Sequence, residues 1–139
     1  MAVRPFHDTD DNRDPEVRVI LWNRLEAGDA GLPFELPPGS HAVTVAAPSG
    51  IVPNGTVALW CYSNDLQNWG TVKDTAGEQI VNAQGIRHVA SPLPKFIRPA
   101  VDWTSPAGTS INFALHVAFR QISPVPAGDI ADNVVGITA

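Results

Sequence analysis

The side chains best suited to nucleophilic or metal chemistry in this chain of 139 residues are one cysteine and four histidines. The histidines lie far apart in the sequence and lack a close ligand spacing such as His-x-His, at positions His7, His41, His88 and His116. Cys61 shares a strand face with Val57 and Leu59, so we expect it to be a small buried hydrophobic residue and not a nucleophile. We predict no catalytic, metal-binding or cofactor-binding residue.

The carboxylates suggest structural tasks rather than paired acid and base chemistry. Those that could form a catalytic pair stand in or beside turns, where Asp usually bonds to its own backbone: Asp65, Asp74, Glu78 and Asp102. Residues 8–14 resemble the first half of a calcium loop, but Arg13 occupies the position of the sharp-turn glycine and Val19 that of the final glutamate. Common catalytic and nucleotide-binding motifs are also absent from the sequence. The sequence therefore predicts a protein that is not an enzyme.

The four tryptophans are numerous for this length, and two of them raise a question of placement. Trp22 and Trp60 each lie on the strand face opposite the aliphatic residues of their segment. They would fill the core of a two-sheet fold, form a surface for a protein partner, or stack on a sugar ring. As a partner interface we propose these two residues together with further aromatic and apolar positions outside the clearest strands: Phe6, Trp103, Val134 and Ile137.

Composition excludes several classes of protein. Charged residues make up only 17% of the chain, against roughly 25% in typical soluble domains, which is usual where much of the surface meets another protein. The net charge is −5 and the nine basic residues are scattered, so direct nucleic-acid binding is not expected. A single cysteine excludes an internal disulfide and fits an intracellular origin. The start of the chain has no apolar leader, and no run of about 18 apolar residues suggests a membrane span.

Strand periodicity dominates the chain, and no segment shows a convincing helical period. The clearest strand is 109–119, in which Ile111, Phe113, Leu115, Val117 and Phe119 occupy one face. Further strands are expected at 17–25, 41–47, 55–62 and 95–103, with Pro99 indicating an edge strand or a bulge in the last. Thirteen prolines and eleven glycines separate these segments. The pattern predicts an all-β fold, an antiparallel β-sandwich, with a jelly roll as the favoured form.

The ends of the chain differ from the centre in composition. Residues 1–16 are polar and acidic and are interpreted as an extended N-terminal arm without its own core. Residues 17–120 form the predicted β-sandwich domain. Residues 121–139 have no clear period but are too apolar for a solvated tail, so we expect this C-terminal tail to pack either on its own domain or on a neighbouring protein.

Three segments within 17–120 together resemble a known family. The first has Trp22 followed by the Gly-Asp-x-Gly-x-Pro run of 28–33, the second is the strand and Ser-Asn-Asp turn of 57–69, and the third joins the Ile-Arg-Pro run of 97–99 to the strand 111–119. They are similar to the jelly-roll capsid cement, or decoration, proteins of tailed bacteriophages. The resemblance implies a virion structural protein that binds the outer capsid surface and clamps neighbouring copies of the major capsid protein. It also implies a homodimer or homotrimer, made in the host cytoplasm and located on the capsid exterior.

A second interpretation comes from the tryptophans and the turn 63–69. Ser-Asn-Asp turns before a Trp also occur in sugar-binding and adhesive β-sandwiches. The alternative is therefore a carbohydrate-binding or host-attachment module of a phage tail. Neither interpretation requires a cofactor or contact with a membrane.

Overall fold

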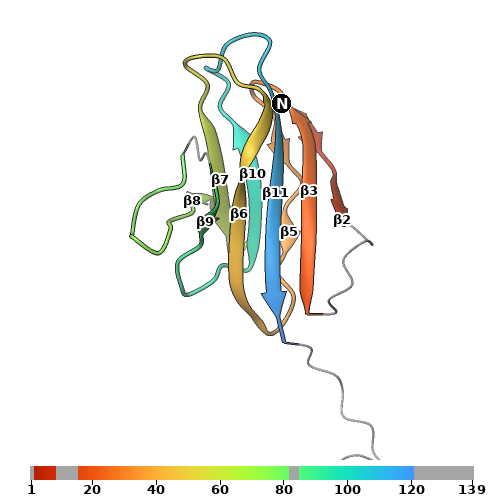
Figure 1. The fold of residues 1–139 in the computed structure, drawn as a ribbon, viewed down its shortest axis with the longest axis vertical. Helices are drawn as coiled ribbons and strands as arrows, with labels where there is room; N and C mark the ends of the chain where they lie inside the picture. The colour runs from red at the N-terminus through yellow and green to blue at the C-terminus, as the bar shows by residue number, and fades with distance from the viewer. Residues whose placement is uncertain (1, 9–15, 82–84, 121–139) are drawn as a thin grey trace, which may run out of the picture.

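The computed structural model describes residues 2–8, 16–81 and 85–120. These residues form strands and turns with no helix, and the strands make two sheets that pack face to face (Figure 1). The predicted all-β sandwich is therefore confirmed. Val134 and Ile137, and the whole predicted tail at 121–139, lie outside the described residues.

The six-stranded sheet has the order β1–β4–β10–β7–β8, and β5 also pairs with β10. Its strands are β1 (Val3–Arg4), β4 (Ala30–Gly31), β5 (Phe34–Glu35), β7 (Ala58–Ser63), β8 (Gly70–Thr71) and β10 (Phe96–Val101). The five-stranded sheet has the order β2–β3–β11–β6–β9. Its strands are β2 (Phe6–Asp8), β3 (Val17–Leu25), β6 (Ser40–Ile51), β9 (Arg87–His88) and β11 (Ser110–Phe119). Every pairing is antiparallel except that of β1 with β4.

Strand β11 is the centre of the five-stranded sheet, paired with β3 on one side and β6 on the other. Its alternation is the one predicted, with one face buried against the other sheet at Ile111, Phe113, Leu115 and Val117. His116, on the opposite face, is exposed. The unbroken apolar face therefore sets which side of this sheet meets the core.

The core contains a chain of edge-to-face aromatic contacts. Trp60 lies 5.7 Å from Trp22 and 5.5 Å from Phe113, measured between ring centroids, and Trp22 lies 6.0 Å from Phe6. Trp22 and Trp60 are 0% and 1% exposed, so the assignment of these two residues to a partner interface is wrong. In both strands the large aromatic side chain takes the inner face, and the aliphatic residues opposite it face outward.

The interpretation of the N-terminal segment as an arm is also corrected for its described part. Val3–Arg4 pairs with β4 of one sheet, and Phe6–Asp8 pairs with β3 of the other. Phe6 is partly buried against the core, where its ring lies 5.4 Å from Phe34. Strand pairing and the partly buried Phe6 thus place residues 3–8 within the domain.

Two prolines lie within strands in ways that the sequence did not predict. Pro99 is in β10, which is an inner strand and not an edge. On the side away from β7, β10 pairs with the two short strands β4 and β5, and the pairing is interrupted between them. A Cβ on Gly31 would lie 2.7 Å from Cδ of Pro99, so the glycine makes room for the ring. The other proline is Pro48, directly after the predicted strand 41–47; β6 continues past it to Ile51, with a register shift between Asn112 and Ala114.

Candidate functional site

The outward side of the five-stranded sheet is the most distinctive surface of the domain. Cross-strand registers place its side chains in three rows. These are His7–Leu21–Ala114–Ala46, then Val19–His116–Thr44–His88, then Val17–Ala118–Ala42. We refer to these residues as the outer face. It contains no Asp, Glu, Lys or Arg and consists of small, aliphatic and histidine side chains.

Charged residues near the outer face belong to its border. Arg24 has a left-handed backbone with φ of 58°, and its N–H donates to Oδ1 of Asn112 at 2.8 Å. This hydrogen bond lies at the register shift between β3 and β11, outside the three rows and next to the first of them. Arg18 and Asp8, which form an ion pair, project from alternate positions of β3 and β2 toward the opposite side. The outer face is therefore free of formal charge across its middle, with charge confined to the rim.

The structure does not bring together the remaining residues of the predicted partner interface. Phe6 packs against the core, as described above. Trp103 is 79% exposed and stands in the turn after β10, beside Gly28. Both Trp103 and the turn at 102–105 lie at one end of the sandwich, away from the middle of the outer face. Of the predicted set, Trp103 alone is a large exposed aromatic residue within the described part of the chain.

The turn at 63–68 is organised by Asp65, as the sequence predicted. Oδ1 of Asp65 accepts hydrogen bonds from Ser63 Oγ at 2.9 Å and from the backbone N–H groups of Gln67 and Asn68 at 2.9 and 2.8 Å. Asn68 Nδ2 donates to Oδ2 at 2.7 Å. These bonds, led by the one from the Asn68 backbone, lower the pKa of Asp65 strongly. The carboxylate stays ionised, and the turn is held by the exposed side chains of Asp65 and Asn68 together with the buried hydroxyl of Ser63.

Two hollows lie on either side of Tyr62, at the end of β7. The larger, of about 400 Å³, extends from Tyr62 past Lys73 to the segment 89–94. The smaller, of about 310 Å³, lies over the turn and is lined by Asp65, Asn68 and Trp69. Tyr62 and Asn64 line both hollows, and Tyr62 is 38% exposed. Tyr62 is not among the predicted site residues, since strand alternation places it on the same face as buried Trp60.

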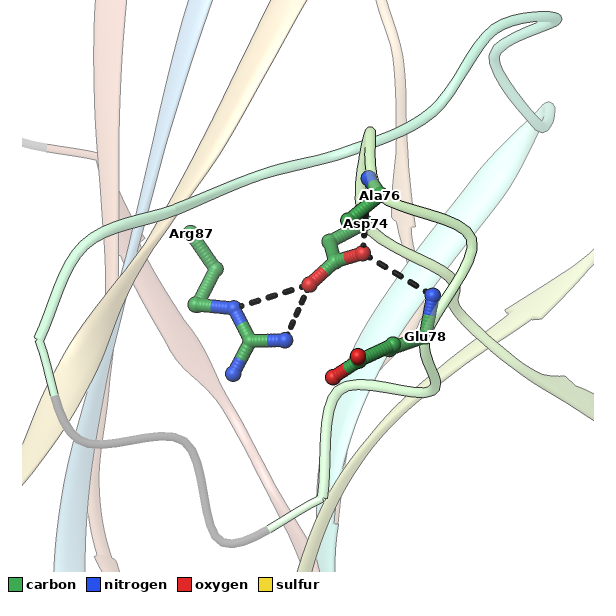
Figure 2. A network of polar contacts seen from close by, with 4 residues as sticks. All are labelled: Asp74, Ala76, Glu78 and Arg87. Atoms are coloured by element: carbon green, nitrogen blue, oxygen red, sulfur yellow. Dashed lines mark hydrogen bonds and ion pairs between the residues drawn. The ribbon is translucent and has the colours of Figure 1, made fainter.

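Asp74 forms the second carboxylate network, in the hairpin closed by the bridge between Lys73 and Gln79. Figure 2 shows its carboxylate between the Arg87 guanidinium and the turn backbone. Oδ1 accepts from the N–H groups of Ala76 and Glu78, both at 2.9 Å, and Oδ2 accepts from Arg87 Nε at 3.1 Å and also from Arg87 Nη2. The bond from Arg87, followed by that from Glu78, lowers the pKa of Asp74. The three partners Ala76, Glu78 and Arg87 thus tie the hairpin to β9.

Asp102 has a similar local task. Its Oδ2 accepts from the Thr104 backbone N–H at 3.1 Å and from the Thr104 hydroxyl, and these bonds lower the pKa of Asp102. The carboxylates of Asp65, Asp74 and Asp102 thus each stabilise the turn in which they lie.

Cys61 lies on the outward side of the six-stranded sheet, opposite Arg98 of β10. Burial raises the pKa of its thiol, and the charge of Arg98 opposes this in part. The Arg98 guanidinium stacks on the Trp69 ring, with Cζ 3.9 Å from the centroid. Cys61 is half-buried and not fully buried as expected, and the raised pKa keeps it a thiol near neutral pH.

The structure assembles no evident metal centre from the described residues. Within 2–8, 16–81 and 85–120, no three His, Cys, Asp or Glu side chains are grouped so that they could hold a metal ion. Of the segment that resembles a calcium loop, only Asp8 is described, and it pairs with Arg18. In the same ranges no helix is long and apolar enough to cross a membrane.

Comparisons with family models, with curated proteins and with solved structures find no match to this chain.

Proposed function

We propose that this chain is a non-enzymatic capsid cement protein that binds the outside of a phage capsid through its outer face. In this proposal the partner is the major capsid protein, and the chain clamps neighbouring capsid subunits by contact alone. The observation that carries the proposal is the absence of formal charge across the outer face. Covering charged side chains costs desolvation energy, whereas small and aliphatic side chains favour burial.

The size of the outer face suits part of a stable interface. With strands about 4.8 Å apart and same-face residues about 6.8 Å apart, each position covers about 33 Å², so the eleven positions of the outer face cover about 360 Å². Standard protein interfaces bury about 800 Å² on each partner, so the outer face would supply roughly half of one. Surface beyond these three rows would supply the rest.

The strand order supports the jelly-roll form that the family resemblance implies. The strands β3, β4/β5, β6, β7/β8, β9, β10 and β11 alternate between the two sheets along the chain. A jelly roll is a double sheet of eight strands built from two Greek keys, and such alternation is expected of it. This supports the proposed relation to cement proteins and leaves their mode of oligomerisation, dimer or trimer, as part of the proposal.

The test is co-sedimentation of the purified chain with phage heads that lack it, after light scattering has established its oligomeric state. His116→Glu places a charge in the middle of the outer face at an exposed position. We expect this variant to bind heads at least about tenfold more weakly, because the new carboxylate would be buried without a partner.

The matched control is Gln67→Glu, which adds the same charge in the exposed turn at 63–68. It should bind heads as the unchanged chain does, and both variants should melt within about 2 °C of it. A chain that ignores heads overturns the proposal. Equal binding by the two variants shows that the outer face is not the contact surface.

A further inference from the structure

We propose that the two hollows that meet at Tyr62 form one groove that binds an oligosaccharide. We call it the Tyr62 groove and define it by Tyr62, Asn64, Asp65, Asn68, Trp69 and Lys73. It uses residues of the six-stranded sheet and its loops, so the inference does not rest on the proposed capsid contact. The ring of Tyr62 is its centre, because it lines the hollow on each side.

The Tyr62 ring is held as a platform by Gly70. The two residues are paired across β7 and β8. A Cβ on Gly70 would lie 2.8 Å from Cε1 and 3.0 Å from Cζ of the ring, so the ring crosses directly over the glycine. The aromatic surface is thus positioned before any ligand arrives, and a rigid aromatic residue with few rotatable bonds loses little entropy on binding.

The polar lining provides both donors and acceptors around this ring. Asn64 Oδ1 accepts a hydrogen bond from the Lys95 backbone N–H at 2.9 Å, which fixes the orientation of the side-chain amide. Asn64 Nδ2 donates no hydrogen bond to any of the described residues. Asn68 Nδ2 donates a hydrogen bond to Oδ2 of Asp65, so both side chains are held at the rim of the groove. Their oxygens have further lone pairs that can accept hydrogen bonds. Lys73 adds a cation to the larger hollow.

This combination fits a glycan better than the other extended ligands. Sugar hydroxyls both donate and accept hydrogen bonds, and the C–H face of a pyranose ring is apolar enough to pack on an aromatic ring. Single-stranded nucleic acid also stacks on aromatic residues, but it needs a positively charged groove. Here an ionised Asp65 stands at the rim of a chain whose net charge is −5. The groove therefore favours a neutral or weakly acidic oligosaccharide.

The test uses the full chain on a microarray of short neutral and acidic oligosaccharides, followed by calorimetric titration with the strongest binder. We expect Tyr62→Ala to weaken binding at least about tenfold through loss of the stacking surface, and Tyr62→Phe to stay within about threefold. Gly70→Ala should also weaken binding, because the added Cβ forces the ring to move while the ring itself is kept. Trp103→Ala is the control, since it removes an exposed aromatic residue at the other end of the sandwich.

Melting curves of each variant separate loss of binding from loss of folding. If Tyr62→Ala does not fold, backbone amide shifts of the unchanged chain on titration should centre on 62–73. The inference is overturned if no oligosaccharide on the array binds, if a single-stranded oligonucleotide binds in its place, or if only Trp103→Ala reduces binding. Head binding by Tyr62→Ala should be unchanged, so failure here is distinct from failure of the capsid proposal.

Discussion

Trp22 and Trp60 have the same burial but differ in one hydrogen bond, and this difference gives a sharp test of the core. The Trp22 indole N–H donates to the Leu32 carbonyl at 3.1 Å. The Trp60 indole nitrogen is buried and has no hydrogen-bond partner among the described residues. Replacing each with Phe removes a similar amount of apolar surface and keeps an aromatic ring in contact with its neighbours.

The two substitutions should therefore cost different amounts of stability. Loss of roughly 40 Å² of buried surface costs about 1 kcal/mol at either site. Trp22→Phe also leaves the carbonyl of the partly exposed Leu32 without its donor, which adds about 1–2 kcal/mol. The total loss of unfolding free energy is then about 2–3 kcal/mol. Trp60→Phe removes a buried N–H that has no partner, and this gain offsets the lost surface, so we expect about 0–1 kcal/mol.

Unfolding by urea and by heat, followed by far-UV circular dichroism, measures this difference without relying on the altered fluorescence. A gap of about 2 kcal/mol corresponds to about 6–10 °C in Tm for a domain of this size. The m-value should stay constant, because both variants expose nearly the same surface on unfolding. If both variants melt like the unchanged chain, the two side chains are not in the core. If both lose the same stability, the hydrogen bond to Leu32 contributes nothing.

Two further predictions concern the central strand and the charged turns. Phe113→Ala should destabilise the fold by about 3–5 kcal/mol, whereas His116→Ala on the exposed side of the same strand should stay within about 0.5 kcal/mol; equal losses in urea unfolding would contradict the assigned faces. The lowered pKa of Asp74 means that its contribution to stability is complete above the unfolded value of about 3.9 and is lost as pH falls through the lower folded value. Asp74→Asn should therefore lower Tm at pH 7, and the difference from the unchanged chain should shrink below about pH 4; a difference that does not depend on pH would refute the role of the charge.

Local sequence pattern was sufficient for β3 and β11 but not for β6, which was predicted as 41–47 and extends over Ser40–Ile51. The segment 17–25 was predicted with the bounds that β3 has, and 109–119 differs from β11 by one residue, because side-chain alternation is a local property. The Asp65 turn was also predictable, since Ser, Asn and Asp bond to nearby backbone. Pro99 was not, because its place in an inner strand depends on the gap between β4 and β5, which are distant in sequence.

The candidate site was less predictable for a related reason. A strand with apolar residues on both sides, such as 17–25, does not say which side meets the core. Pairing with β11 decides it, since Leu115 and Phe113 place Ile20 and Trp22 inward. Val17, Val19 and Leu21 then face outward and form part of the outer face. The alternation that predicts the strand therefore contains this surface but does not show that it faces outward.

The arrangement of the two proposed surfaces follows from strand β9 at the edge of the sandwich. His88 belongs to the outer face, and the lining of the larger hollow begins one residue later, at Val89. Figure 1 shows β8 and β9 near each other at the edge of the molecule opposite β2. A partner that covers the outer face around His116 would therefore approach the Tyr62 groove only at its border. The two proposed surfaces, one uncharged and the other polar, can in this way be carried by separate parts of one small sandwich.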